Sequence, residues 1–175
     1  MLLAIACFTV GCTELEKGTA VTRSEPPQDV WQLVERAVSL VPLTVERMEA
    51  LLGTSMTQSD QSPARWNGGP VQFSDALTVP SSTITIRDGA WTYAGFGTQS
   101  DQCITADMVK THYPTVELTY GVTGHSIHES FGWTVSYDWG ELGFGIRVKD
   151  DCLAGISLVP AVELKHQEEQ RKQRP

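Results

Sequence analysis

The strongest constraint on the fold of this chain is an alternation of apolar side chains near its C-terminal end. Between residues 131 and 148 every second residue is apolar, with a break at the turn Asp138–Glu141. The two runs are Phe131, Trp133, Val135 and Tyr137, and then Leu142, Phe144, Ile146 and Val148. Alternation with a period of two is typical of strands that bury one face. The Gly-containing turn between the runs predicts that the two strands form a hairpin.

The second strand of this hairpin carries Gly143 and Gly145 on the face opposite Phe144. Two glycines on one face of a strand let a backbone or an aromatic ring approach closely, or they relieve a bend in the strand. Cys103 and Cys152 bracket the hairpin together with a short helix pattern that follows Cys103. A disulfide between them would tie that helix to the last turn of the segment.

The order of helix and strand patterns along the rest of the chain predicts an α+β fold with N-terminal helices and an antiparallel sheet. One helix is expected at about residues 29–40. A second begins at the N-cap Thr44 and ends at Gly53. Residues 54–69 are polar and are expected to form a long loop. Further strands are expected at residues 71–79, 82–87, 91–96, 116–120 and 153–159.

Composition predicts one domain at residues 29–160, because 175 residues with 41% hydrophobic content supply one sizeable core. Residues 12–28 are rich in polar residues and proline and are expected to form a tether. Residues 161–175 carry mostly charged or amide side chains, and this composition predicts a frayed helix or an unstructured tail. The formal net charge of −8 disfavours nucleic-acid binding and favours a basic protein partner.

Residues 1–11 are apolar or small throughout, which predicts a signal peptide. They lead into Thr9-Val10-Gly11-Cys12, which resembles a bacterial lipobox and implies lipidation of Cys12. The match departs from the usual pattern in two ways, since no Lys or Arg precedes the apolar run and Thr9 stands where Leu is common. The stretch Ala4-Ile5-Ala6-Cys7 is an alternative box.

The count of cysteines favours lipidation at Cys12 over Cys7. Cleavage before Cys12 removes Cys7 and leaves Cys103 and Cys152 as a pair, whereas cleavage before Cys7 leaves one cysteine without a partner. Export to an oxidising compartment agrees with a disulfide between that pair. By resemblance to lipoprotein sorting in enteric bacteria, Thr13 after the lipidated cysteine implies an outer-membrane lipoprotein that faces the periplasm.

Two phrases of the sequence are alike. Residues 43–48 (Leu-Thr-Val-Glu-Arg-Met) and 104–109 (Ile-Thr-Ala-Asp-Met-Val) each place an apolar residue before a Thr cap and an acid in the first helical turn. They predict two tandem helix-plus-sheet units at residues 29–97 and 103–160, with chance similarity as the alternative. This layout resembles that of the beta-lactamase-inhibitor-protein group and of small outer-membrane assembly lipoproteins of the SmpA/OmlA type. The resemblance implies a fold and does not fix a function.

The residues able to carry chemistry favour binding over catalysis. His125, His128 and Glu129 could ligate zinc, but their spacing is not that of zinc-protease helices, and Gly124 and Ser130 favour an exposed loop. The sequence contains neither a nucleophile elbow nor a phosphate-binding glycine loop. We therefore expect no catalytic residue, no metal and no cofactor.

The same loop is instead expected to bind a protein partner through His125, His128 and Glu129, together with Trp139 at the tip of the hairpin turn. The leading expectation is a non-catalytic envelope lipoprotein that binds and inhibits a secreted toxin or hydrolase, as an immunity protein does. The alternative is an accessory or structural lipoprotein of outer-membrane assembly. A third reading is a metal-dependent hydrolase that uses His125 and His128.

Overall fold

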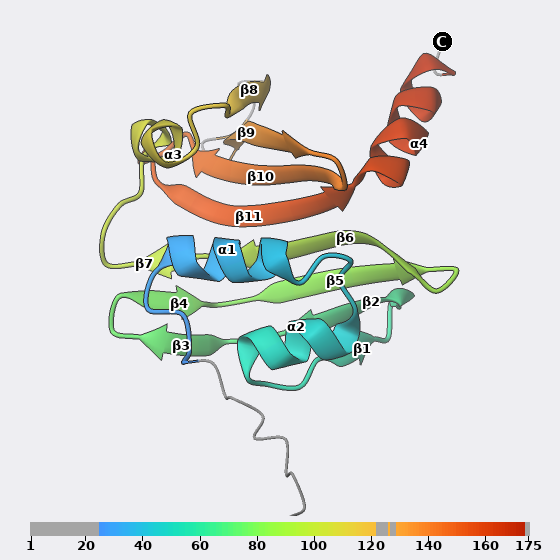
Figure 1. The fold of residues 1–175 in the computed structure, drawn as a ribbon, viewed down its shortest axis with the longest axis horizontal. Coiled ribbons are helices and arrows are strands. Elements are labelled where there is room, and N and C mark those ends of the chain that lie inside the picture. The colour runs from blue at the N-terminus through green and yellow to red at the C-terminus, as the bar shows by residue number, and fades with distance from the viewer. Residues whose placement is uncertain (1–24, 122–125, 127–128, 174–175) are drawn as a thin grey trace, which may run out of the picture.

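The computed structural model describes residues 25–121, 126 and 129–173, and it confirms the α+β class (Figure 1). The described helices are α1 (Val30–Ser39), α2 (Val45–Leu52), α3 (Ala106–His112) and α4 (Ala161–Lys172). The strands of an eight-stranded antiparallel sheet are, in spatial order, β1 (Thr57–Ser59), β2 (Ser62–Gly68), β5 (Ser82–Arg87), β6 (Ala90–Gly97), β11 (Leu153–Pro160), β10 (Gly140–Arg147), β9 (Ser130–Tyr137) and β8 (Glu117–Tyr120). A smaller sheet contains β3 (Val71–Ser74), β4 (Leu77–Val79) and β7 (Gln99–Ser100).

The large sheet consists of two four-stranded meanders joined in the middle. The first half places β1, β2, β5 and β6 side by side in chain order after α1 and α2, and the second half places β8 to β11 in chain order after α3. The last strands of the two halves, β6 and β11, pair antiparallel, with Ala94 opposite Leu158 and Phe96 opposite Ile156. This strand order is the one that two tandem helix-plus-sheet units would produce. The repeat in the sequence itself stays a prediction.

The predicted hairpin forms β9 and β10, and its turn is shorter than the expected Asp138–Glu141, because Gly140 already pairs with Tyr137. Phe144 lies opposite Trp133, Leu142 opposite Val135, and Ile146 opposite Phe131. Directly opposed residues in an antiparallel pair point to the same face, and the side chains of Leu142, Phe144 and Ile146 are buried there. The alternation therefore marks the face of the sheet that carries the core.

The N-terminal helices begin and end where their caps predict. The Asp29 side chain accepts a hydrogen bond from the backbone N–H of Gln32 at 2.9 Å, and Thr44 Oγ1 accepts one from Arg47 at 3.2 Å. Each of these bonds satisfies a donor that the first helical turn leaves open. Gly53 ends α2 in the left-handed region, at φ 68°.

One core lies between the helices and a single face of the large sheet. The helices contribute Leu33, Val34, Met48, Leu52 and Val109, and the sheet contributes Ile84, Ala94, Phe96, Ile156 and Leu158. Figure 1 shows α1 and α2 in front of the strands of the first half, with α3 beside those of the second. Both halves therefore share one apolar layer.

The prediction of a loop at residues 54–69 is wrong, because this segment forms β1 and β2. Trp66 lies opposite Ile84 of β5 and packs against the core, while Arg65 and Asn67 on either side of it are exposed. One apolar side chain is enough to attach a polar strand to the neighbouring strand, which a search for apolar alternation does not detect. The single strand expected at 71–79 is in fact the pair β3 and β4, and the short strand β7 follows β6, where no strand was expected.

The charged tail is helical over most of its length. Helix α4 extends away from the sheet at the end of β11 (Figure 1), and none of its residues is buried. Lys172 Nζ lies 2.6 Å from Glu168 Oε1, one turn earlier on the helix. Such i,i+4 pairs support an exposed helix only modestly.

The turn between β9 and β10 depends on Gly140, and we predict that Gly140→Ala is strongly destabilising. Its φ of 148° is unfavourable for any side chain, and a Cβ atom would lie 2.0 Å from the backbone oxygen of Val159. We expect a loss of about 3 kcal/mol in the free energy of unfolding, measured by urea denaturation.

The control for this measurement is Gly145→Ala on the same strand. A Cβ atom there would meet nothing closer than 3.7 Å, so we expect this variant to unfold at the denaturant concentration of the original chain or above it. Equal stability of the two alanine variants would contradict the prediction.

Candidate functional site

The large sheet has one covered face and one open face. On β10 the buried residues Leu142, Phe144 and Ile146 alternate with Gly145 and Arg147, which are partly exposed. The same alternation of buried and partly exposed residues is found along β5 and β11. We call the side of the sheet away from the helices the open face.

A row of four glycines crosses the centre of the open face. Gly97 of β6 lies opposite Gly155 of β11, which lies opposite Gly145 of β10, which lies opposite Gly132 of β9. We call these four residues the glycine row. Gly145 was expected on this face from the alternation along its strand, whereas the other three glycines join it only through the strand register. The space above Gly97 and Gly132 is taken by Ser81 Oγ and by the Cβ atom of Tyr120, whereas at Gly145 no atom lies closer than 3.7 Å to a Cβ position, so the backbone there is close to the surface.

The next row of residues across the same four strands also consists mainly of small side chains. It contains Gly95, Ser157, Gly143 and Thr134 on the same four strands. A Cβ atom on Gly143 would lie 2.4 Å from Ser157 Oγ, so the serine hydroxyl occupies the space above this glycine. The centre of the open face thus carries small residues, and their side chains have no charge.

Two tyrosines border this area. The Tyr93 ring lies over Gly95, since a Cβ atom on that glycine would lie 2.5 Å from the tyrosine hydroxyl oxygen. At the other side, the Cβ atom of Tyr120 would lie 2.7 Å from a Cβ atom on Gly132. Tyr93 is 39% exposed and Tyr120 is 68% exposed. Tyrosine combines a large apolar ring with a hydroxyl group, which suits it to anchoring a protein interface.

The hydroxyl of Tyr93 is neutral at physiological pH. Partial burial raises the pKa of this phenol above its ordinary value, and the positive charge of Arg65 opposes the rise without cancelling it. The group can therefore both donate and accept a hydrogen bond.

Two connected hollows lie along the glycine row. The first has a volume of about 370 Å³ and is lined by Tyr93, Ser130 and three residues of the glycine row. The second has a volume of about 540 Å³ and lies at the ends of β6 and β11. Gly97 and Ala154 line both.

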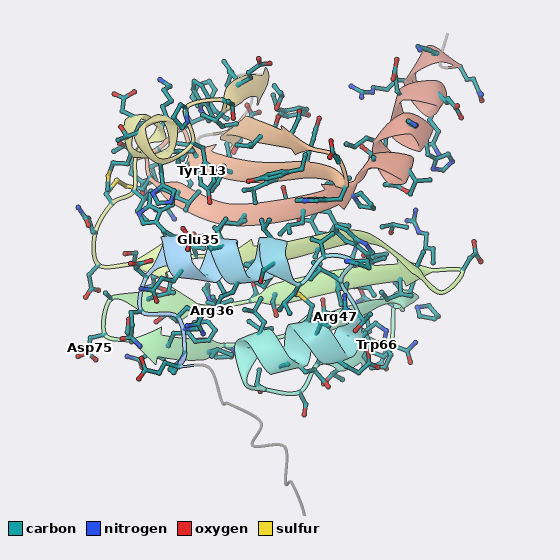
Figure 2. The ribbon with its side chains drawn as sticks, viewed as in Figure 1. Glu35, Arg36, Arg47, Trp66, Asp75 and Tyr113 are labelled. Atoms are coloured by element: carbon teal, nitrogen blue, oxygen red, sulfur yellow. A yellow bond between two sulfur atoms is a disulfide. The ribbon has the colours of Figure 1, made fainter. Side chains whose placement is uncertain are left out.

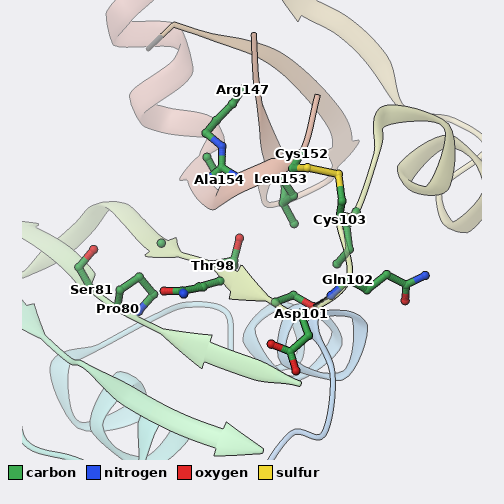
Figure 3. Close-up of a pocket in the computed structure, with 14 residues that line it drawn as sticks. Pro80, Ser81, Thr98, Asp101, Gln102, Cys103, Arg147, Cys152, Leu153 and Ala154 are labelled. Atoms are coloured by element: carbon green, nitrogen blue, oxygen red, sulfur yellow. Dashed lines mark hydrogen bonds between the residues drawn. A yellow bond between two sulfur atoms is a disulfide. The ribbon is translucent and has the colours of Figure 1, made fainter. Parts of the chain in front are cut away.

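The second hollow is polar (Figure 3). Arg147 lies on one side, with its Nε atom 2.9 Å from Asp150 Oδ1. On the other side is Thr98, which is only 6% exposed and whose hydroxyl has no hydrogen-bond partner among the described residues. In Figure 3 this hydroxyl is directed toward the side where Arg147 and Ala154 lie. The open face therefore continues into a polar recess at one end.

The predicted disulfide is present beside this recess. Cys103 and Cys152 are bonded, with their Cα atoms 5.1 Å apart. The bond joins the segment before α3 to the turn between β10 and β11, as the sequence predicted. A backbone hydrogen bond from Leu153 to the carbonyl of Ile104, at 2.8 Å, holds the same two segments together.

The predicted partner-binding residues are described only in part. Cys12, His125 and His128 lie outside the described residues. Glu129 is partly buried, and its carbonyl accepts a hydrogen bond from the backbone of Val148 at 2.9 Å. It is adjacent to Ser130, which lines the first hollow. This places the end of the predicted binding loop next to the glycine row.

Trp139 lies at the hairpin turn but packs onto its own domain. Its ring stacks on Tyr137, with centroids 5.1 Å apart, and its centroid lies 6.1 Å from that of Trp91. The residue is partly buried against the core. One part of the Trp139 ring is therefore exposed at the turn, and the other part packs against the domain. A role for Trp139 in partner binding stays a prediction.

Two further features of the described residues bear on function. Over the described ranges 25–121, 126 and 129–173, no group of three His, Cys, Asp or Glu side chains is arranged to hold a metal ion. No described helix has both the length and the apolar character needed to cross a membrane.

Comparison of the chain with models of known protein families, with curated proteins and with solved structures finds no match. The resemblance to inhibitor proteins and assembly lipoproteins therefore stays a prediction from layout.

We predict that loss of the disulfide lowers stability substantially. The bond closes a loop with a sequence separation of 49 residues, for which chain entropy corresponds to about 4 kcal/mol. The variant Cys103→Ser/Cys152→Ser should show a decrease of this order in the free energy of unfolding. Measurement is by urea denaturation, with the oxidised chain as control. A double variant as stable as the oxidised chain would contradict the structural role of the bond.

We predict that Trp139→Ala costs about 2 kcal/mol in the free energy of unfolding, because the ring loses its contacts with Trp91 and Tyr137. Trp139→Phe keeps an aromatic ring at this site and should cost less than about half as much. Thermal and urea denaturation of both variants measure the effect. If Trp139→Ala is as stable as the original chain, the ring does not stabilise the fold and the prediction is wrong.

Proposed function

We propose that this chain is a non-catalytic envelope lipoprotein that binds and inhibits a secreted toxin or hydrolase. The observation that supports the proposal is the open face, where the glycine row runs between Tyr93 and Tyr120. Its centre of small residues lets a partner's backbone or aromatic side chain come close to the sheet. The two tyrosines supply anchors of the type that dominate the energetics of protein interfaces.

The arrangement supports an extended contact better than enclosure of a small substrate. The second hollow contains Asp101 and Arg147 but lies at one end of the glycine row. The first hollow, on the row itself, is lined mainly by glycine, serine and alanine beside a few larger apolar residues. Such groups offer few of the titratable side chains that acid–base or nucleophilic catalysis requires. Inhibition would follow because a bound partner has its active surface covered.

Charge supports a basic partner. The chain has a formal net charge of −8, and opposite net charges raise the rate at which two proteins meet. We therefore expect the association rate with the partner to fall as the salt concentration rises.

The proposal includes attachment to the outer membrane through Cys12, supported by the lipobox-like residues that end in this cysteine and by the polar segment after it. Mass spectrometry of the chain from a membrane fraction should find a diacylglyceryl group on an N-terminal Cys12. A mature chain that starts at another residue would contradict this anchor.

The experiment that tests the function places a side chain on the glycine row. Gly145→Gln should fold normally, because a Cβ atom at this site makes only ordinary contacts, but it should obstruct the approach of a partner. Gly145→Ala is the matched control, since it changes the backbone preference in the same way and adds only a methyl group.

The readout is protection of a bacterial host against secreted effectors encoded beside the gene for this chain. Each effector is expressed in the periplasm with the original chain, Gly145→Ala or Gly145→Gln. We expect the first two to restore growth, and Gly145→Gln to restore it about tenfold less well or worse, because a side chain in the interface weakens binding. Full protection by Gly145→Gln would contradict the role of the open face.

A second candidate is an accessory lipoprotein of outer-membrane assembly, supported by the same layout and anchor. It predicts that deletion of the gene makes cells permeable to large antibiotics in the absence of any toxin. The inhibitor function predicts normal permeability, so this one assay separates the two.

A further inference from the structure

On the helix side of the molecule, α1 and α3 meet through aromatic rings. The rings of Trp31 and His112 stack with centroids 4.4 Å apart and an angle of 9° between their planes. Tyr113 packs edge-on against His112 at 5.0 Å and lies 5.2 Å from the core residue Phe144. These contacts hold the C-terminal end of α3 at a fixed place beside α1.

Beside this contact is a hollow of about 360 Å³ between the two helices and the end of β9. Its lining consists of Glu35, Val38, Ser39, His112, Tyr113 and Tyr137. Figure 2 shows Glu35 on the side of α1 that faces Tyr113. Tyr137 lies on the helix side of the sheet, because it continues the alternation of Trp133 and Val135. The hollow and the open face are therefore on opposite sides of the sheet.

The groups around the hollow are electron-rich. Glu35 supplies a carboxylate, and Tyr113 and Tyr137 supply phenol rings and hydroxyl oxygens. No lysine or arginine is among the residues that line it. Among the lining residues, His112 is the one that can carry a positive charge, when protonated, and its Nε2 lies 3.7 Å from Glu35 Oε1.

Burial raises the pKa of Tyr113 to about 12, with further contributions from the neighbouring Tyr137 and from the negative charge of Glu35. Burial disfavours a charge of either sign, whereas the negative charge of Glu35 disfavours a second negative charge in the hollow and favours a positive one. Tyr113 therefore remains a neutral phenol that presents its oxygen and its ring at physiological pH.

We propose that this hollow binds an organic cation: the ammonium or guanidinium group at the end of a basic side chain, or a free quaternary ammonium compound. Aromatic faces attract cations through the ring quadrupole, most strongly where water is partly excluded. A carboxylate at the rim adds direct charge attraction. Together they form a site of the kind that recognises alkylated or planar cations.

The proposal is independent of the proposed inhibitor function. A partner could use both sides of the sheet, but variants of the open face leave this hollow unchanged, and variants of the hollow leave the glycine row unchanged. The failure of one proposal therefore leaves the other standing.

The test is a titration of the folded chain, followed by NMR, with three probes: guanidinium, tetramethylammonium and Nα-acetyl-arginine amide. Ionic strength is kept constant with sodium chloride, so that general screening does not change. We expect saturable shifts of the side-chain signals of Trp31 and His112. A stronger effect of acetyl-arginine amide indicates a basic protein side chain, and a stronger effect of tetramethylammonium indicates a small quaternary ammonium compound.

Glu35→Gln removes the charge and keeps the shape of the side chain, and it should weaken binding of the best probe by about fivefold or more. Glu35 is largely exposed on α1, so the fold should be retained, and a thermal melt verifies this. Glu46→Gln on α2 makes the same change in net charge away from the hollow and should bind as the original chain does. Absence of saturable binding for all three probes, or equal affinity in Glu35→Gln, would overturn the proposal.

Discussion

The pairing of β6 with β11 is the contact on which the rest of the fold depends. It is the only described ladder that joins the two four-stranded meanders, and it places Phe96, Ala94, Ile156 and Leu158 in one apolar layer. Without it, each half would leave an unpaired edge strand and half a core. The pairing also requires glycine, since a Cβ atom on Gly155 would lie 2.9 Å from the backbone oxygen of Phe96.

The pairing of β6 with β11 gives the two sides of the sheet different properties. On the helix side the two halves bring the carboxylate of Glu35 on α1 together with rings at the end of α3 and on β9 around one hollow. On the other side, they align small residues into the glycine row, with a tyrosine from each half at its margin. Neither surface exists within one half alone. Any function of either surface is therefore a property of the joined sheet.

The elements that could be predicted from the sequence are those whose apolar side chains repeat with a clear period, those that have a capping residue at one end, and the disulfide. The hairpin around Phe144, the cap at Thr44 and the bond between Cys103 and Cys152 are of this kind. The sequence did not predict β2, where only Trp66 reaches the core. It also did not predict the glycine row or the hollow at Glu35, because their members are far apart in the chain and become neighbours only through strand register and helix packing.

The glycines of β10 and β11 do not all serve the same purpose, and the difference bears on function. Glycine is required by the fold at positions 140 and 155, where a Cβ atom would strike backbone oxygen atoms at 2.0 and 2.9 Å. At position 145 the nearest atom to a Cβ would be 3.7 Å away. Alanine would fit there and would lose less conformational entropy on folding. Side-chain packing therefore does not require glycine at position 145, but the ladder between β10 and β11 shifts register directly after this residue, and glycine is common at such irregularities. The proposed use of this surface by a partner would be a second reason for a residue without a side chain.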